Sequence, residues 1–218
     1  MDERLINTLK SGAKELGVDL SEGALALFDA YLTELKAWNK KINLTAIETD
    51  GEIVTKHFLD SLTPYKYLTG VKRLLDIGAG GGFPGLPLKI VAPALEVVLM
   101  DAVEKKVHFM RHIIRKLGLK GAFAVAGRVE DPSVIDWHKG TFDAVISRAF
   151  TELKVFLSMA APYVGHGGMI IAMKGPQYKE ELEGAEGLKG FKTPEVYEAR
   201  VPFTDRTTVI IIFRKDIG

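Results

Sequence analysis

The chain has no cysteine among its 218 residues, which excludes disulfides, thiolate metal ligands and a cysteine nucleophile. It has no run of eighteen apolar residues and no basic, apolar leader, so we expect neither a membrane span nor export. Neither sign of charge is in excess, because 29 Lys and Arg face 28 Asp and Glu. These absences favour a cytoplasmic protein whose overall charge does not mark it as a nucleic-acid binder.

The chain does have enough apolar material, 47% of its residues, to bury one substantial core. Residues 1–65 are predicted to form a helical N-terminal extension. One helix follows Ser21, a candidate N-cap, and carries apolar residues at helical spacing: Leu25, Phe28, Leu32, Leu35 and Trp38. A further helix is predicted over about 52–62, with Asp50 as its cap.

From residue 66 onward, short apolar runs alternate with turns and helical segments. The predicted strands in this part are 73–78, 96–101, 122–127, 142–148 and 168–175. Such alternation is typical of a parallel sheet covered by helices on both faces. Two more runs, 197–203 and 207–215, predict a hairpin that places an antiparallel strand at the end of the sheet. We therefore expect a seven-stranded α/β domain over residues 66–218.

The most informative stretch is LLDIGAGGGFPG, residues 74–85, in which glycines follow directly after a predicted strand. Glycines at a strand end let the backbone turn sharply and let a ligand approach without a Cβ in the way. The stretch resembles the cofactor-binding signature of the Rossmann-like class I S-adenosylmethionine methyltransferases. In that signature an acid stands two residues before the first glycine, as Asp76 stands before Gly78.

A nicotinamide enzyme is the alternative on this motif. Gly80, Gly82 and Gly85 satisfy the G-x-G-x-x-G fingerprint, and Asp101 after the second strand suits a ribose in either class. Three features favour the methyl donor: the acid at Asp76, the strand series that ends in a hairpin, and the lack of a second domain to carry hydride chemistry.

Further site residues are predicted from the rule that ligands bind at the carboxyl ends of the strands. Asp101 is expected at the ribose hydroxyls, Val129 and Glu130 at the adenine, and Ser147 and Arg148 at the methyl group. Simpler roles stay open, because Glu130 could cap a helix, as could Asp131 beside it, and Arg148 could only pair with a carboxylate.

The acceptor chemistry is narrowed by what the chain lacks. Methylation of a pyrimidine carbon needs a thiolate, and the chain has no cysteine. Many exocyclic-amine enzymes carry an Asn- or Asp-Pro-Pro-aromatic turn after the fourth strand, whereas residues 146–150 read ISRAF. A ring nitrogen such as guanine N7 has a free lone pair, so it needs alignment and charge stabilisation more than a general base. Arg148, with Phe150 beside it, suits that task.

A local basic patch is compatible with a nucleic-acid substrate. Between Val103 and Lys120 a single acid, Glu104, faces six cations: Lys105, Lys106, Arg111, Arg115, Lys116 and Lys120. The alternative is an ordinary solvated helix face over a buried stripe formed by Val107, Met110, Ile114 and Leu117.

Over nearly its whole length the chain resembles the RsmG family, the bacterial 16S ribosomal RNA guanine-N7 methyltransferases also known as glucose-inhibited division protein B. The matching pieces are Trp38-Asn39, Asn43-Leu44-Thr45, residues 57–62 (HFLDSL), 75–85 (LDIGAGGGFPG), 127–130 (GRVE), 146–150 (ISRAF) and 173–175 (MKG). The resemblance implies S-adenosylmethionine as cofactor and a guanine of small-subunit ribosomal RNA as substrate.

The site predicted from the motifs and the resemblance together combines cofactor contacts with catalytic residues. The predicted cofactor contacts are Asp76, Gly78, Gly80, Phe83, Asp101, Val103, Val129, Glu130 and Arg148. Arg148 and Ser147 are the catalytic candidates. No metal-ligand cluster is evident, and we expect a monomer that binds the small ribosomal subunit and no membrane.

Other polar residues each have a functional and a structural interpretation. His57, Asp60 and Ser61 share a helical face, which predicts a hydrogen-bonded cluster at the cofactor or RNA entrance, with a purely structural role as the alternative. The polar residues of Asn43-Leu44-Thr45 are expected to close a turn, and Lys174 could meet a phosphate. A noncatalytic RNA-binding factor that keeps the fold is a third alternative, against which the intact glycine loop argues.

Overall fold

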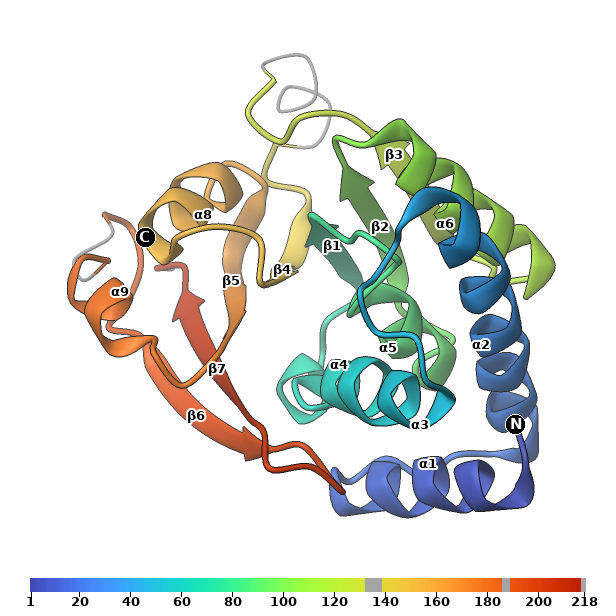
Figure 1. Ribbon diagram of the computed structural model, residues 1–218. Helices are drawn as coiled ribbons and strands as arrows, with labels where there is room; N and C mark the ends of the chain where they lie inside the picture. The colour runs from blue at the N-terminus through green and yellow to red at the C-terminus, as the bar shows by residue number, and fades with distance from the viewer. Residues whose placement is uncertain (132–138, 186–188, 217–218) are drawn as a thin grey trace.

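A seven-stranded sheet runs through the centre of the protein (Figure 1). The computed structural model describes residues 1–131, 139–185 and 189–216. The strands are β1 (Arg73–Ile77), β2 (Glu96–Asp101), β3 (Ala122–Ala126), β4 (Phe142–Arg148), β5 (Val164–Lys174), β6 (Glu195–Arg200) and β7 (Thr207–Arg214). Their order in the sheet is β3-β2-β1-β4-β5-β7-β6, so the chain reverses its direction of travel across the sheet between β3 and β4.

The first five strands are parallel, and β7 is antiparallel to both of its neighbours. The predicted hairpin is therefore present, formed by β6 and β7. The antiparallel end of the sheet is also confirmed: β7 pairs with β5 and leaves β6 at the edge of the sheet. The reason is burial: the β7 residues Thr208 to Phe213 are all buried, whereas β6 has no buried residue, and a buried strand belongs inside a sheet.

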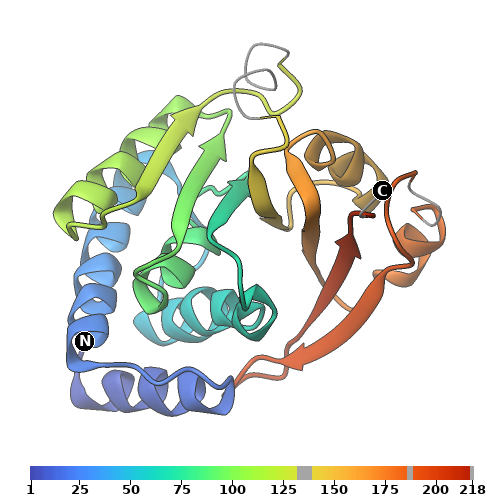
Figure 2. The ribbon, with the colours of Figure 1, turned by 180° about the vertical axis from the view of Figure 1, so that it is seen from behind.

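Helices cover both faces of the sheet, as the view from behind also shows (Figure 2). The helical segments are α1 (Glu3–Glu15), α2 (Glu22–Ile42), α3 (Asp50–Glu52), η1 (Ile53–Leu59), α4 (Asp60–Leu62), η2 (Tyr65–Leu68), α5 (Gly85–Val91), α6 (Glu104–Lys116), α8 (Leu153–Ala160) and α9 (Lys179–Glu183). No helix among the described residues is long and apolar enough to cross a membrane.

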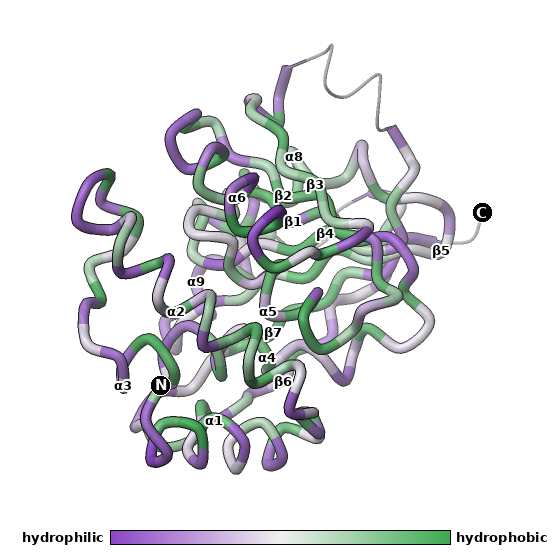
Figure 3. Tube along the Cα trace, turned by 90° about the vertical axis from the view of Figure 1, so that its right-hand side faces the viewer, coloured by the Kyte–Doolittle hydropathy of each residue, from purple (hydrophilic) through white to green (hydrophobic). Residues whose placement is uncertain are grey.

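Alternate residues of each strand point into two separate cores. Leu74 and Leu99 pack with the N-terminal helices, α5 and α6, whereas Leu75 and Met100 pack with α8 on the opposite face. Figure 3 shows the hydrophobic residues gathered along the central strands. The N-terminal helices thus share one core with the sheet, so they are placed to contribute residues to a site at its edge.

The N-terminal helices begin mostly where the sequence predicts. Ser21 caps α2, and its Oγ accepts from the Ala24 N–H at 3.1 Å. The helix predicted over 52–62 begins at Asp50, and its cap is Thr49 instead of Asp50, because the Thr49 hydroxyl accepts from the Glu52 N–H. Its middle, η1, is a π-helix, in which the Asp60 N–H donates to Thr55 O five residues earlier. Such wide turns are frequent at functional sites.

Helix α6 buries a stripe that differs partly from the predicted one. Val107 and Met110 are buried as expected, but Phe109 and Ile113 complete the stripe, while Ile114 and Leu117 are only partly buried. The helix packs against both the sheet and α2, and the second contact widens its buried face toward Phe109, whose ring lies 5.6 Å from that of Trp38.

Candidate active site

The glycine loop after β1 is held to the end of β2 by one carboxylate. Asp101 Oδ2 accepts from the Gly80 N–H at 2.9 Å, and its Oδ1 accepts from the Val103 N–H at 2.8 Å. The Gly78 N–H donates to Met100 O at 2.8 Å, and Gly78 has a φ of +70°, a conformation that favours glycine. Asp101 therefore sets the shape of the loop and stands at its mouth.

A cavity of about 380 Å³ opens beside this loop, at the carboxyl ends of β1, β2 and β4. Its volume lies in the range of about 300–1,000 Å³ that is usual for cofactor pockets. Five of the predicted cofactor residues line it: Gly78, Asp101, Val103, Val129 and Glu130. The other lining residues are Ile77, Met100, Ala102, Lys106, Gly127, Arg128, Ala149, Phe150 and Met159.

The cavity fits S-adenosylmethionine on the chemistry of its lining. Each Asp101 oxygen accepts one backbone N–H and retains a second lone pair, which suits ribose hydroxyls. Val129 offers an apolar surface for an adenine ring, and Glu130 is an exposed acid beside it. Gly78 adds no side chain to the lining of the cavity, and a Cβ at this position would lie 2.2 Å from Phe150, another lining residue.

Four other predicted cofactor residues do not line this cavity: Arg148 lines a second cavity, described below, and the remaining three belong to the glycine loop and the strand before it. Asp76 is fully buried on the opposite face of the loop, where its Oδ2 accepts from the Gly85 N–H at 2.8 Å. Gly80 contributes its N–H to Asp101. Phe83 is buried between two rings, with centroids 4.5 Å from His57 and 5.5 Å from Tyr31. In this structure all three shape the loop.

The Asp76 carboxyl carries an unusual protonation state. Burial raises its pKa from 3.8 to about 7, against the opposing effects of the Gly85 hydrogen bond and of Arg148. Its Oδ1 has no hydrogen-bond partner among the described residues. Between pH 4 and 7 the folded protein therefore keeps a proton that the unfolded chain has released, and stability from this group falls as pH rises through that window.

We expect Asp76→Asn to remove this pH dependence. The free energy of unfolding of the variant relative to the wild type should rise between pH 4 and 7 by a few kcal/mol, since one pKa unit corresponds to about 1.4 kcal/mol. Urea unfolding at a series of pH values measures it, with Asp19→Asn, the same change at an exposed position, as the matched control. A difference that does not change with pH would show that Asp76 is not protonated in the folded protein.

A second cavity, of about 510 Å³, lies between the N-terminal helices and the β6–β7 hairpin. Its lining is Ile47, Lys56, His57, Asp60, Arg148, Ala149, Met173, Lys174, Gly175, Pro176, Val201, Asp205, Arg206, Thr207 and Thr208. The two cavities share Ala149, so their contents would meet at the end of β4. We refer to them as the cofactor cavity and the acceptor cavity.

The turn after β4 divides its residues between the two cavities. Ala149 has a φ of +51°, which is uncommon for a residue with a side chain. Arg148 before it lines the acceptor cavity, and Phe150 after it lines the cofactor cavity. The expectation that Phe150 works beside Arg148 is therefore wrong, because the left-handed turn sends the two side chains apart.

Arg148 is held by the helices of the N-terminal extension. Its Nη1 donates to Asp60 Oδ2 at 2.8 Å and to Lys56 O at 3.2 Å, and its Nη2 donates to His57 Nδ1 at 3.1 Å. The Thr208 hydroxyl donates to the other Asp60 oxygen. The predicted cluster of His57 and Asp60 thus lines the acceptor cavity, whereas Ser61 is buried behind it and donates to His57 O.

Other predicted polar residues have structural partners. Ser147 is buried and donates to Ile77 O at 2.7 Å, so its hydroxyl joins β4 to β1 and lines neither cavity. Lys174 lines the acceptor cavity, but its Nζ pairs with Glu181 at 2.6 Å, which explains why it is not free for a phosphate. The helix that Glu130 or Asp131 would cap falls on residues 132–138, outside the described residues.

Some cations of the basic patch on α6 are bound to an acid or to a backbone oxygen, and others are exposed. Glu34 of α2 lies 2.8 Å from His112 Nε2 and 3.6 Å from Lys116 Nζ, and Arg111 donates to Ala124 O. Lys105, Arg115 and Lys120 are exposed, and Lys106 reaches the cofactor cavity. Arg111 and Lys116 therefore anchor the helix, and Lys105, Arg115 and Lys120 are left at the surface.

Sequence comparison gives the relatives of the chain. Residues 24–207 match the family described as rRNA small subunit methyltransferase G. The protein named Ribosomal RNA small subunit methyltransferase G from Geotalea uraniireducens (strain Rf4) is 44% identical over 218 residues, 99% of this chain and 99% of the relative. Its namesake from Geobacter sp. (strain M21) is 45% identical over 210 residues, 94% and 96% of the two chains.

Solved structures share the fold at low identity. The O-methyltransferase from Bacillus cereus in complex with SAH has a TM-score of 0.60 and 17% identity, covering 86% of this chain and 91% of the other. TrmI, a tRNA methyltransferase from Aquifex aeolicus, has a TM-score of 0.58 and 20% identity, covering 72% and 68%.

The sheet order, the antiparallel β7 and the glycine loop after β1 define the class of protein: a class I methyltransferase with a Rossmann-like fold. Its methyl donor is S-adenosylmethionine, and the nicotinamide alternative is wrong. Within that class, the chain belongs to the rRNA small subunit methyltransferase G family.

Several residues of the two cavities were not predicted as site residues. Lys56, Arg206 and Thr208 line the acceptor cavity, and Arg128 and Met159 line the cofactor cavity. Their positions depend on how the N-terminal helices and the hairpin pack around the end of β4. The sequence predicts only that a turn joins the two runs of the hairpin, and it does not show what packs beside that turn.

Proposed function

We propose that this methyltransferase transfers a methyl group from S-adenosylmethionine to N7 of a guanine in the 16S ribosomal RNA of the small subunit. The observation that carries the proposal is the pair of cavities that meet at Ala149, one lined by Asp101 and the other by Arg148. The name that the relatives share, Ribosomal RNA small subunit methyltransferase G, supports ribosomal RNA as the acceptor.

The groups around Arg148 suit an acceptor that needs no deprotonation. When bound, the cofactor supplies an electrophilic methyl group on a sulfonium. The His57 Nδ1 lone pair is engaged by Arg148, and both Asp60 oxygens accept hydrogen bonds, so neither group is poised as a general base. Guanine N7 attacks with a free lone pair, and therefore the task of the protein is alignment.

Arg148 is suited to align the guanine through its remaining donors. A guanidinium has five N–H groups, and three hydrogen bonds to described residues leave two for a ligand. Guanine O6 lies beside N7 on the same edge of the base and accepts from arginine in many complexes. The Asp60 carboxylate offsets the charge of Arg148, which lessens repulsion of the positive charge that the base gains on methylation.

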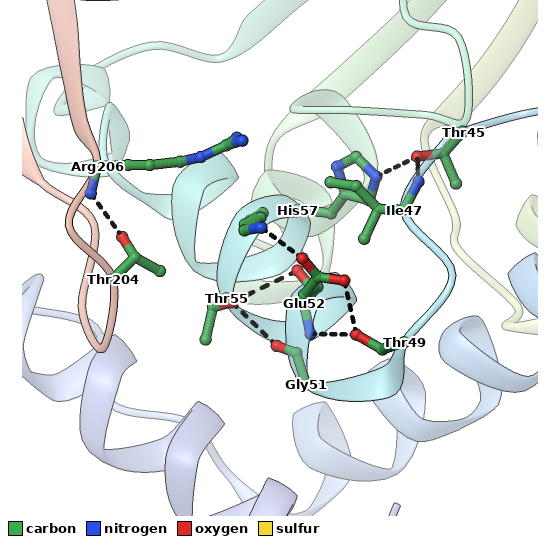
Figure 4. Close-up of polar contacts among 10 residues, drawn as sticks. Thr45, Ile47, Thr49, Gly51, Glu52, Thr55, His57, Thr204 and Arg206 are labelled. Carbon is green, nitrogen blue, oxygen red and sulfur yellow. Dashed lines mark hydrogen bonds and ion pairs between the residues drawn. The ribbon is translucent and has the colours of Figure 1, made fainter.

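The rim of the acceptor cavity supplies a cation for the RNA backbone. Arg206 is exposed and extends from the hairpin toward the helix that carries His57 (Figure 4). Its backbone N–H donates to Thr204 Oγ1 at 3.1 Å, which fixes the turn that presents it. We assign Arg206 to a phosphate near the target base, with the exposed lysines and arginines of α6 as a more distant contact.

We also propose how the chain is organised and where it works. Residues 66–218 form the S-adenosylmethionine-binding domain, and residues 1–65 are an extension that supplies one wall of the acceptor cavity. The enzyme would act as a monomer in the cytoplasm, on small ribosomal subunits and without membrane association. Sedimentation of the enzyme alone and with subunits tests the oligomeric state.

Methyl transfer to purified substrate tests the reaction. Radiolabelled S-adenosylmethionine is incubated with small subunits, and with free 16S rRNA, from a strain that lacks the endogenous enzyme, and the nucleosides are then separated. We expect label in 7-methylguanosine. Label in another nucleoside would contradict the N7 assignment, and no label with either substrate would favour a noncatalytic RNA-binding factor.

A further inference from the structure

The guanidinium of Arg148 is surrounded by acceptors from one short stretch of chain. Lys56 O, His57 Nδ1 and Asp60 Oδ2 each accept one of its N–H groups, and all three residues lie in η1 or at its end. The ring of Phe83 lies on another side, with its centroid 5.1 Å from Arg148 Cζ. The orientation of Arg148 therefore depends on the orientation of the groups around it.

His57 accepts from Arg148 only in one tautomer. A guanidinium has donors and no acceptor, so His57 Nδ1 must carry a lone pair, and the ring proton must be on Nε2. Nε2 lies 2.7 Å from Thr45 Oγ1 (Figure 4). The Thr45 oxygen is therefore the acceptor for the Nε2 proton.

The ring is also neutral. Burial lowers the pKa of His57 to about 3, with further lowering by the charges of Arg148 and Arg206. Its face is stacked on Phe83 of the glycine loop, with 4.5 Å between the centroids and 12° between the planes. The stacking fixes the plane of the ring, and the Thr45 contact fixes its rotation within that plane.

Thr45 is itself held in place from two directions. The Asn39 side chain donates to Thr45 O through Nδ2 and accepts from the Thr45 N–H through Oδ1, both at 2.9 Å. Thr45 Oγ1 also accepts from the Ile47 N–H at 3.0 Å, which closes the turn expected from the sequence. Asn39 at the end of α2 thereby places the Thr45 hydroxyl beside His57.

We infer that Thr45 and His57 are positioning residues for Arg148: Thr45 accepts the Nε2 proton of His57 and holds the ring so that Nδ1 orients the guanidinium toward the acceptor cavity. This inference rests on the proposed function, in which Arg148 aligns the target base. Neither Thr45 nor His57 lines the cofactor cavity, so their effect is confined to the acceptor side.

The ring proton can be observed directly by nitrogen NMR of protein labelled with 15N-histidine. We expect a neutral His57 with the proton on Nε2 at pH 7, assigned by the signal that disappears in His57→Asn. A neutral ring protonated on Nδ1, or a charged ring, would overturn the inference. This readout needs no catalysis, so it decides the inference even if the wild type makes no 7-methylguanosine and the proposed function fails.

Kinetics of Thr45 variants test whether the contact matters to the reaction. Thr45→Val removes the hydroxyl at nearly constant volume, and we expect kcat to fall about tenfold with unchanged cofactor affinity, as for the loss of one hydrogen bond. Thr45→Ser should restore most of the rate. The matched control is Thr33→Val, the same change at an exposed hydroxyl of α2, which should leave kcat unchanged.

A double-mutant cycle separates positioning from support of the turn, because Thr45→Val also removes the acceptor of the Ile47 N–H. In His57→Asn the amide oxygen can still accept from Arg148, but no group reaches Thr45. If Thr45 acts through His57, Thr45→Val costs little in that background. An equal loss of kcat in both backgrounds would show that Thr45 only supports the turn and would overturn the inference.

Discussion

Arg148→Ala should lower kcat for methyl transfer by about 100- to 1,000-fold, the usual effect of removing one aligned donor from a reacting group. Arg148 lines the acceptor cavity and not the cofactor cavity, so the affinity for S-adenosylmethionine should change little. Single-turnover kinetics and calorimetric titration of the cofactor measure the two quantities separately.

Two further variants show what Arg148 contributes. Arg148→Lys keeps the charge but loses the planar fork, and we expect it to stay slow because an ammonium cannot satisfy the same three acceptors and still reach the base. Arg206→Ala removes the same charge at the rim and should raise KM for RNA more than it lowers kcat. Full activity of Arg148→Lys, or lost cofactor binding in Arg148→Ala, would contradict the role in alignment.

Gly78→Ala should abolish most cofactor binding. An added Cβ would lie 2.2 Å from Phe150 Cδ2, and the ring could escape it only by moving along the lining of the cofactor cavity. The φ of +70° adds a strain of about 1–2 kcal/mol to any residue with a side chain. We expect the dissociation constant for S-adenosylmethionine to rise at least tenfold, which corresponds to about 1.4 kcal/mol of binding energy.

Gly70→Ala provides the matched control for backbone strain. Gly70 has a φ of +83°, but no atom lies within 4 Å of the Cβ that alanine would add. Both variants should lose stability in thermal unfolding, and only Gly78→Ala should lose cofactor affinity. Equal cofactor affinity in the two variants would mean that the loop does not contact the cofactor at Gly78.

The sheet and the cofactor side of the site could be predicted from sequence because their signals are local. A strand that ends in glycines has one usual geometry, and the acids and apolar residues after the next strands must lie at the same sheet edge. Gly78, Asp101 and Glu130 accordingly line one cavity. The exceptions are Asp76 and Phe83, for which spacing along the chain does not show which side of the loop a side chain takes.

The acceptor side could not be predicted in the same way, because it is assembled from segments far apart in the chain. Arg148 meets His57 from 91 residues away, and Thr208 meets Asp60 from 148 residues away. The left-handed turn at Ala149 and the π-helix around His57 have no clear sequence signal. The sequence did identify His57, Asp60 and Arg148 as candidate polar residues, but it did not show that their side chains are in contact.

The most direct test of the account is to map the modification in cells. The chain is expressed in bacteria that lack the endogenous enzyme, and their 16S rRNA is treated with borohydride and then aniline, which cleave RNA at 7-methylguanosine. We predict one new cleavage site in 16S rRNA with the wild-type chain, and its absence with Arg148→Ala produced at the same level. An unchanged cleavage pattern with wild-type chain that is folded and binds S-adenosylmethionine would contradict guanine N7 of 16S rRNA as the target.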